Sequence, residues 1–94
     1  VAGLKNADVL FLANHGIIVT GPSIDVAFDD LYYLERACML QVLGMSTGKP
    51  LRIVPEAIAR ATAEQMTDDT QARLHFIALK RLLDRDEPGW SKLR

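Results

Sequence analysis

The sequence predicts a mixed α/β fold in which two short strands are followed by three helices. Two apolar runs rich in β-branched residues lie close together near the start, and three longer segments with helical signals follow them. This order is typical of an α+β fold or of a layered α/β sandwich. The 94 residues can form one domain at most, because domains usually run to about 100–150 residues.

The two predicted strands are Val9–Ala13 and Ile17–Thr20. The first is a continuous apolar run, which favours a strand that is covered on both faces. Asn14, His15 and Gly16 separate the two runs and form the connection between them. This spacing fits either a bent hairpin or two successive strands joined at a sharp corner.

A long helix is predicted from Ser23 to Leu43. Ser23 is a good N-cap residue, and Asp25 places negative charge near the positive end of the helix dipole. No Gly or Pro interrupts the segment, and Gly44 offers a C-terminal stop. Apolar residues recur at spacings of three and four, which predicts one buried face: Ile24, Ala27, Phe28, Leu31, Leu34, Cys38 and Val42.

Two further helices are predicted in the second half of the chain. Lys49–Val54 should be extended, because Pro50 and Pro55 disfavour helix in the residues before them. Pro55 at a first helical position then starts a helix that ends near Met66. Thr67 is the expected N-cap of the last helix, which ends near residue 84.

We interpret residues 1–94 as a single partial domain in which residues 85–94 form a charged tail, with Trp90 as its anchor. The chain starts with Val1 and enters an apolar strand without a basic leader segment. A chain of this size buries only roughly 60–70% of its unfolded surface, so it is marginal as an independent fold. We therefore expect it to be a piece of a longer domain.

Composition narrows the range of partners. The net charge of −1 and pI of about 6.1 give no footprint for nucleic acid or for an anionic membrane surface. The longest apolar run is far shorter than the roughly 20 residues that span a bilayer. Cys38 is the single cysteine and cannot form an internal disulfide, so we expect a reducing, cytoplasmic location. We also expect Cys38 to be a small buried apolar residue.

His15 is the strongest candidate for chemistry. It follows a buried strand in a turn that Gly16 can open, and a side chain at a strand end is held rigidly yet can reach a cleft. Neutral imidazole is a common metal ligand, but one histidine does not make a site, and His15 could instead hydrogen-bond within the turn. We expect the other histidine, His75, to be a surface or packing residue of its helix.

Glu35 is the second candidate, since it shares a helical stripe with Leu31 and Cys38. An unpaired buried carboxylate is costly, so Glu35 should have a partner. A structural hydrogen bond is favoured over a role beside a metal, where Glu35 would hold a ligand in place. The charged residues Asp29, Asp30 and Arg36 are expected to face solvent. Tyr32 and Tyr33 could line a subunit contact or a cleft, but a half-exposed packing role is favoured.

Several stretches of the sequence resemble the class II aldolase/adducin family. They are the strand and turn from Leu10 to Gly16, the segment Val19–Ser23, the helical pairs Ala27-Phe28 and Leu34–Ala37, and the C-terminal run from His75 to Pro88. The similarity covers essentially the whole chain, and it is greatest to bacterial members without an assigned substrate.

The resemblance implies an α/β/α sandwich with a mainly antiparallel central sheet, of which this chain is the C-terminal part. It also implies a cyclic homo-oligomer, in family terms a tetramer. Family aldolases make or break a carbon–carbon bond in small sugar phosphates with a divalent metal, usually zinc. Three histidines hold that metal, and by this match His15 is the third, supported by Asn14 and Gly16 in its turn.

The other parts of the family's site have no counterpart in these residues. The His-x-His pair, the acid/base carboxylate and the phosphate-binding loop belong to the family's N-terminal half. We therefore expect the chain to be an inactive fragment of a metal-dependent lyase acting on a small carbohydrate. Adducin members use the same fold without catalysis, so a non-catalytic oligomerisation or binding module is the alternative.

Overall fold

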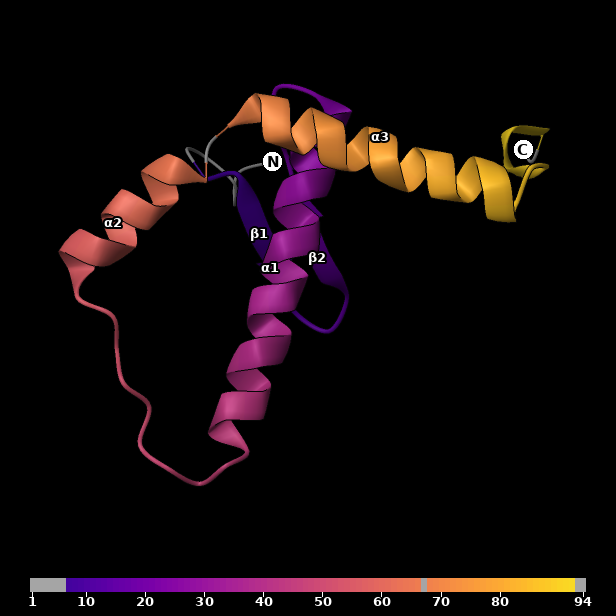
Figure 1. The fold of residues 1–94 in the computed structure, drawn as a ribbon. Helices are drawn as coiled ribbons and strands as arrows, with labels where there is room; N and C mark the ends of the chain where they lie inside the picture. The colour runs from indigo at the N-terminus through magenta and orange to yellow at the C-terminus, as the bar shows by residue number, and fades with distance from the viewer. Residues whose placement is uncertain (1–6, 67, 93–94) are drawn as a thin grey trace.

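The structure is a computed structural model that describes residues 7–66 and 68–92. Two antiparallel strands and three helices succeed one another, which confirms the mixed α/β class (Figure 1). The elements are β1 (Val9–Leu12), β2 (Gly16–Val19), α1 (Ile24–Met45), α2 (Glu56–Gln65) and α3 (Asp69–Asp86), followed by a 3₁₀ turn, η1 (Trp90–Lys92).

The two strands form a hairpin, which settles the alternative that the sequence left open. The register pairs Val9 with Val19 and Leu12 with Gly16, and the Thr20 N–H donates to the Asp8 carbonyl oxygen at 2.8 Å. The expectation that β1 is covered on both faces is wrong for this chain, because Phe11 keeps 64% of its surface exposed. The hairpin has α1 along one face, and no described element lies on the other.

Helix α1 begins directly after Ser23, whose extended backbone (φ −151°) is that of an N-cap residue. Its side chain makes no capping hydrogen bond, however, and hydrogen bonds instead to the Asp25 carboxylate. The helix runs slightly past the expected stop at Gly44, and the chain leaves it through Gly48 at φ +72°. A positive φ at this place suits glycine, which has no Cβ to clash.

The predicted buried face of α1 is not buried in this structure. Leu31 is 38% exposed and Val42 is 66% exposed. Cys38 is also exposed, so the expectation of a buried thiol is wrong here. The apolar spacing that predicted the helix is real, but among the described residues the main contacts of this helix are with the hairpin and α3. Each of them covers part of its length, and the last turns of the helix stay exposed, with Leu43 at 56% and Met45 at 61%.

The second half of the chain follows the predicted order with small shifts. Pro55 is the N-cap of α2 and not its first helical residue. The predicted cap Thr67 lies outside the described residues, whereas the carboxylate of Asp68 accepts a hydrogen bond from the Thr70 N–H at 2.9 Å and caps α3. Trp90 anchors the tail as expected, because its Nε1 donates to Asp84 at 2.7 Å.

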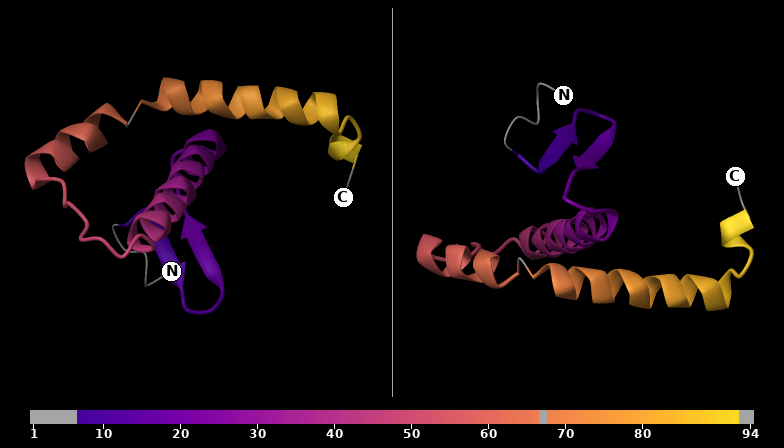
Figure 2. Two further views of the ribbon diagram at one scale, coloured as in Figure 1. Left: turned by 60° about the horizontal axis from the view of Figure 1, so that its bottom comes forward. Right: turned by 90° about the horizontal axis from the view of Figure 1, so that it is seen from above.

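The layers of the structure are the hairpin, α1 and α3, with α1 in the middle (Figure 2). Helix α2 stands apart at the end of the extended segment (Figure 1). The radius of gyration is 16.5 Å, whereas a compact chain of this length has about 12 Å. The accessible surface of 8398 Å² similarly exceeds the roughly 5400 Å² of a compact monomer of this mass.

The described residues do not enclose a hydrophobic core. Ala72, where α3 crosses α1, is the single buried apolar residue among them, with 4% of its surface exposed. None of the helices within residues 7–66 and 68–92 combines the length and apolar character that a bilayer-spanning segment requires.

Candidate functional site

The turn between β1 and β2 carries the candidate metal ligand. The His15 N–H donates to the Leu12 carbonyl oxygen at 3.3 Å, which closes the turn. Asn14 has a φ of 62°, a left-handed conformation that Asn tolerates better than most residues. Gly16 has a φ of 137°, where a residue with a Cβ would be strained. Asn14 and Gly16 thus fix the backbone on both sides of His15, whose side chain is exposed.

A shallow apolar groove lies next to this turn, between the hairpin and α1. Its volume is about 270 Å³, and it is lined by Phe11, Gly16, Ile17, Leu31, Leu34, Glu35 and Cys38. Glu35 therefore shares a groove with Gly16, the residue that follows His15. The expectation that the Glu35 carboxylate lies on a covered side is wrong for this chain, since Glu35 is exposed.

The donor set of this chain fits one ligand position and not a complete metal site. The exposed His15 imidazole on a short, closed turn has the chemistry of a zinc ligand. Yet the described part of the chain contains no group of three or more His, Cys, Asp or Glu side chains that could hold a metal ion. A metal bound by His15 would need its remaining ligands from outside these residues.

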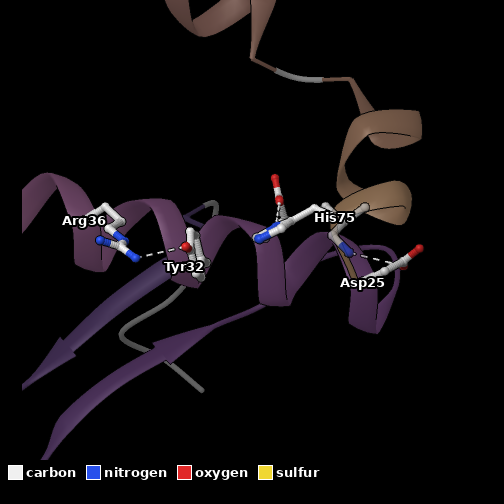
Figure 3. Close-up of polar contacts among 6 residues, drawn as sticks. Asp25, Tyr32, Arg36 and His75 are labelled. Carbon is white, nitrogen blue, oxygen red and sulfur yellow. Dashed lines mark hydrogen bonds and ion pairs between the residues drawn. The ribbon is translucent and has the colours of Figure 1, made fainter. Parts of the chain in front are cut away.

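A second polar centre lies where α3 crosses the N-terminal half of α1. His75 of α3 and Asp29 of α1 form a hydrogen bond between Nδ1 and Oδ1 at 2.6 Å, with 21% and 17% of their side chains exposed (Figure 3). The expectation that Asp29 faces solvent is therefore wrong, because α3 lies across it. His75 was expected to be a surface or packing residue of its helix, and the structure shows the packing role.

Aromatic rings surround the imidazole of His75. The Tyr32 ring meets it edge-on at a centroid distance of 4.5 Å, and the rings of Tyr33 and Phe28 lie at 5.7 and 6.2 Å. The Arg36 guanidinium donates to the Tyr32 hydroxyl at 3.1 Å and remains exposed (Figure 3). The packing role predicted for the two tyrosines is confirmed, and it fixes the orientation of His75.

Two carboxyl groups near the start of α1 have shifted pKa values. Burial raises the pKa of Asp30, and repulsion from Asp29, Asp8 and Asp69 raises it further. The Ser23 side chain, through its hydrogen bond, lowers the pKa of Asp25, and the helix N–H of Val26 also donates to that carboxylate. The surroundings of Asp30 therefore disfavour its ionised form, whereas the hydrogen bonds at Asp25 favour the ionised form of that carboxyl group.

Reasoning from the sequence missed the Asp29–His75 pair. The two residues are 46 positions apart and lie on different helices, so no local spacing connects them. One signal was available, because Asp29 and Tyr33 are separated by four residues and share the face of α1 that α3 covers. The pair lies at the opposite end of the hairpin from the His15 turn, so the structure does not bring the two histidines together.

Comparison with known proteins shows the family. Residues 1–42 match the family model described as the class II aldolase and adducin N-terminal domain. A protein of Pseudomonas aeruginosa, whose name assigns it to the class 2 aldolases, is 32% identical over 95 residues. That alignment covers 95% of this chain. The chain belongs to the class II aldolase/adducin family.

Other relatives have names of a different kind. Decarboxylase NovR of Streptomyces niveus is 33% identical over 83 residues, which cover 83% of this chain and 30% of that protein. Human beta-adducin is 27% identical over 90 residues, 81% of this chain and 12% of adducin. The chain spans 37% of the Pseudomonas relative. No solved structure gives a significant match.

Proposed function

We propose that this chain is the C-terminal part of a metal-dependent lyase domain that makes or breaks a carbon–carbon bond in a small carbohydrate or its phosphate. The observation that carries the proposal is the closed turn that presents His15 in a chain of the class II aldolase/adducin family. The decarboxylase among its relatives also breaks a carbon–carbon bond, which supports the reaction class.

In this proposal His15 is one of three histidine ligands of a divalent metal, with zinc the expected ion. We place the other two ligands, the acid/base carboxylate and the phosphate-binding loop outside this chain, which spans 37% of the Pseudomonas relative. When bound, such a metal acts as a Lewis acid that stabilises an enediolate. The residues of this chain hold one ligand position: Asn14 and Gly16 fix the turn, and the turn fixes the His15 backbone.

The proposal extends to the arrangement of the whole domain. Alternation along the strands places Phe11 and Ile17 toward the groove with α1, and Leu10 and Ile18 on the opposite face of the hairpin. Because both faces are apolar, we propose that a further helix layer and further strands complete an α/β/α sandwich with a mainly antiparallel sheet. We also propose a cytoplasmic homo-oligomer, in family terms a cyclic tetramer.

The metal content of the full-length protein tests the catalytic proposal. Wild-type protein should carry about one zinc ion per chain. His15→Ala should bind the metal at least roughly 10–100-fold more weakly, the loss seen even when the partners of ligands are removed. His75→Gln is the matched control, because it alters the other histidine of these 94 residues and lies away from the turn. Unchanged zinc occupancy in His15→Ala would contradict the proposal.

A role for Glu35 beside the metal can be tested in the same protein. If Glu35 holds the ligand at the turn, Glu35→Gln should weaken metal binding by roughly 10-fold and leave the melting temperature unchanged. If Glu35 is structural, as the sequence favours, the melting temperature should fall at full zinc occupancy. Isothermal titration with zinc and thermal unfolding separate the two roles.

A non-catalytic module is the second candidate, and the match to human beta-adducin favours it. In that case the chain contributes an interaction surface, and His15 closes the turn without binding metal. The residues encoded before Val1 discriminate the candidates. A His-x-His pair with an acidic residue there supports the lyase, whereas apolar or basic residues at those positions support the module.

A further inference from the structure

A cavity of about 560 Å³ lies beside the Asp29–His75 pair, between α1, α3 and the end of α2. This volume falls in the range of about 300–1000 Å³ that is usual for small-molecule sites. The polar side chains that line it come from three places: Asp29 and Tyr33 on α1, Gln71 and His75 on α3, and Gln65 and Asp68 at the junction of α2 and α3. The His15 turn does not contribute to it.

The side chains that line the cavity include both hydrogen-bond donors and hydrogen-bond acceptors. Gln65 and Gln71 each bring an amide that can donate and accept, and Tyr33 brings a hydroxyl that can do both. Asp29 uses Oδ1 for His75 and has Oδ2 as a further acceptor, while His75 uses Nδ1 and has Nε2 as a second polar atom. Met66 and Leu74 add apolar surface.

The chemistry of these side chains favours some classes of ligand over others. No Lys or Arg is among the residues that line the cavity, so nothing there would balance a phosphate or carboxylate group. Within the described residues no three donors are arranged to share a metal ion, and Asp68 is already occupied with the Thr70 N–H. A hydroxyl both donates and accepts, so a molecule with several hydroxyls uses the mixed lining fully.

We propose that this cavity binds a neutral polyhydroxylated molecule, such as an unphosphorylated sugar, with the Asp29–His75 pair as its anchor. Aromatic contacts hold the imidazole in place, and the carboxylate fixes its hydrogen-bonding nitrogen, so both groups are oriented before the ligand arrives. The site is separate from the metal position proposed at His15. The proposal of a sugar site therefore does not depend on the proposed lyase reaction.

Ligand-observed saturation-transfer NMR on the full-length protein tests the site, with D-ribose and D-glucose as probes. Wild type should show transfer to at least one sugar, and transfer should persist in His15→Ala, because His15 is not among the residues that line this cavity. Asp29→Asn should weaken binding about 10-fold or more. Gln71→Leu should weaken it about 5-fold and keep the helix crossing, since Gln71 is exposed and the hydrogen bond between His75 and Asp29 does not involve it. Glu56→Gln, an exposed carboxylate on α2, is the control that should change nothing.

Each other outcome overturns the proposal. Absence of transfer to both sugars in wild type would remove the site, and so would unchanged affinity in Gln71→Leu, even if Asp29→Asn fails to fold. Loss of transfer in His15→Ala would place the sugar at the hairpin turn, which refutes this site and leaves the lyase proposal intact. Equal or stronger binding of inorganic phosphate that Gln71→Leu weakens would show that the ligand class is wrong, whereas phosphate bound at the lyase site should not respond to this substitution.

Discussion

The α1–α3 crossing and the hairpin turn differ in how much of their packing comes from residues of this chain. At the crossing, Ala72 is buried and the Asp29–His75 pair is mostly shielded from solvent. Around the turn, Phe11 is 64% exposed, and the groove between hairpin and α1 is apolar and open. The crossing thus has its partners within these residues, whereas the turn that carries His15 does not.

The difference indicates which part of the chain would depend on residues outside it for the proposed function. Exposed apolar surface on both the hairpin and the C-terminal half of α1 is costly in water, and in the proposed sandwich this is the surface that a further layer would cover. The proposed metal ligand stands on this incomplete side. The sugar site proposed beside His75 stands on the side that the chain closes with its own helices.

The largest expected effect concerns the isolated chain. Residues 1–94 alone should aggregate, remain molten or self-associate tightly, because the hairpin edge and the apolar face of α1 have no cover. A complete domain has a net stability of only about 5–15 kcal/mol, which leaves little to offset this loss. Calorimetry with sedimentation checks the expectation. Sharp, reversible two-state melting of a monomer would contradict it.

The crossing can be probed by overfilling its one buried position. Ala72→Leu in the full-length protein should cost about 1–3 kcal/mol, because α1 and α3 approach each other there. Ala61→Leu is the matched control, since Ala61 lies among the charged residues Glu56, Arg60 and Glu64 on α2. It should change stability by less than about 0.5 kcal/mol. Equal losses in urea unfolding would mean that the crossing is not a packed contact.

The turn can be probed through its backbone. Gly16→Ala should destabilise the protein by about 1 kcal/mol, because φ of 137° is strained for a residue with a Cβ. Gly89→Ala is the matched control, since open space surrounds Gly89 and its φ is ordinary. Thermal unfolding compares the two variants. A Gly16→Ala protein as stable as Gly89→Ala would show that the turn does not constrain His15.

The smallest expected effect lies beside the crossing, at Asp30. Its raised pKa means that the ionised carboxylate weakens the folded state at neutral pH, and that this cost disappears as the pH falls below the usual value of 3.8. Asp30→Asn should therefore be more stable at pH 7 by roughly a few tenths of a kcal/mol, after discounting for solvent screening. The two proteins should converge in acid. A destabilised Asp30→Asn at pH 7 would reverse the sign of this argument.

Local elements could be predicted from the sequence, whereas contacts between them could not. The β-branched run after Gly16, the apolar spacing from Ile24 and the proline at position 55 are local signals, and each element formed within a few residues of its expected bounds. The apolar residues along one side of α1 predicted a buried face, and that prediction holds only where other residues cover this face. Leu31 and Cys38 stay exposed because the described residues do not cover them.

The candidate site shows the same limit. His15 and its turn could be predicted because Asn14 and Gly16 are adjacent in sequence and their backbone preferences are intrinsic. The Asp29–His75 pair could not, since it depends on how α3 crosses α1. The groove that Glu35 shares with Gly16 likewise follows from the way the hairpin folds against α1.

The central claim is that His15 is a metal ligand in a domain completed outside these residues. A crystal structure of the full-length protein, grown with zinc and measured at the zinc absorption edge, tests it most directly. We predict an anomalous peak about 2.0–2.1 Å from a ring nitrogen of His15, with two further histidine nitrogens at similar distances. A fully ordered domain with no anomalous peak at His15, or with a zinc ion bound elsewhere, would contradict the account.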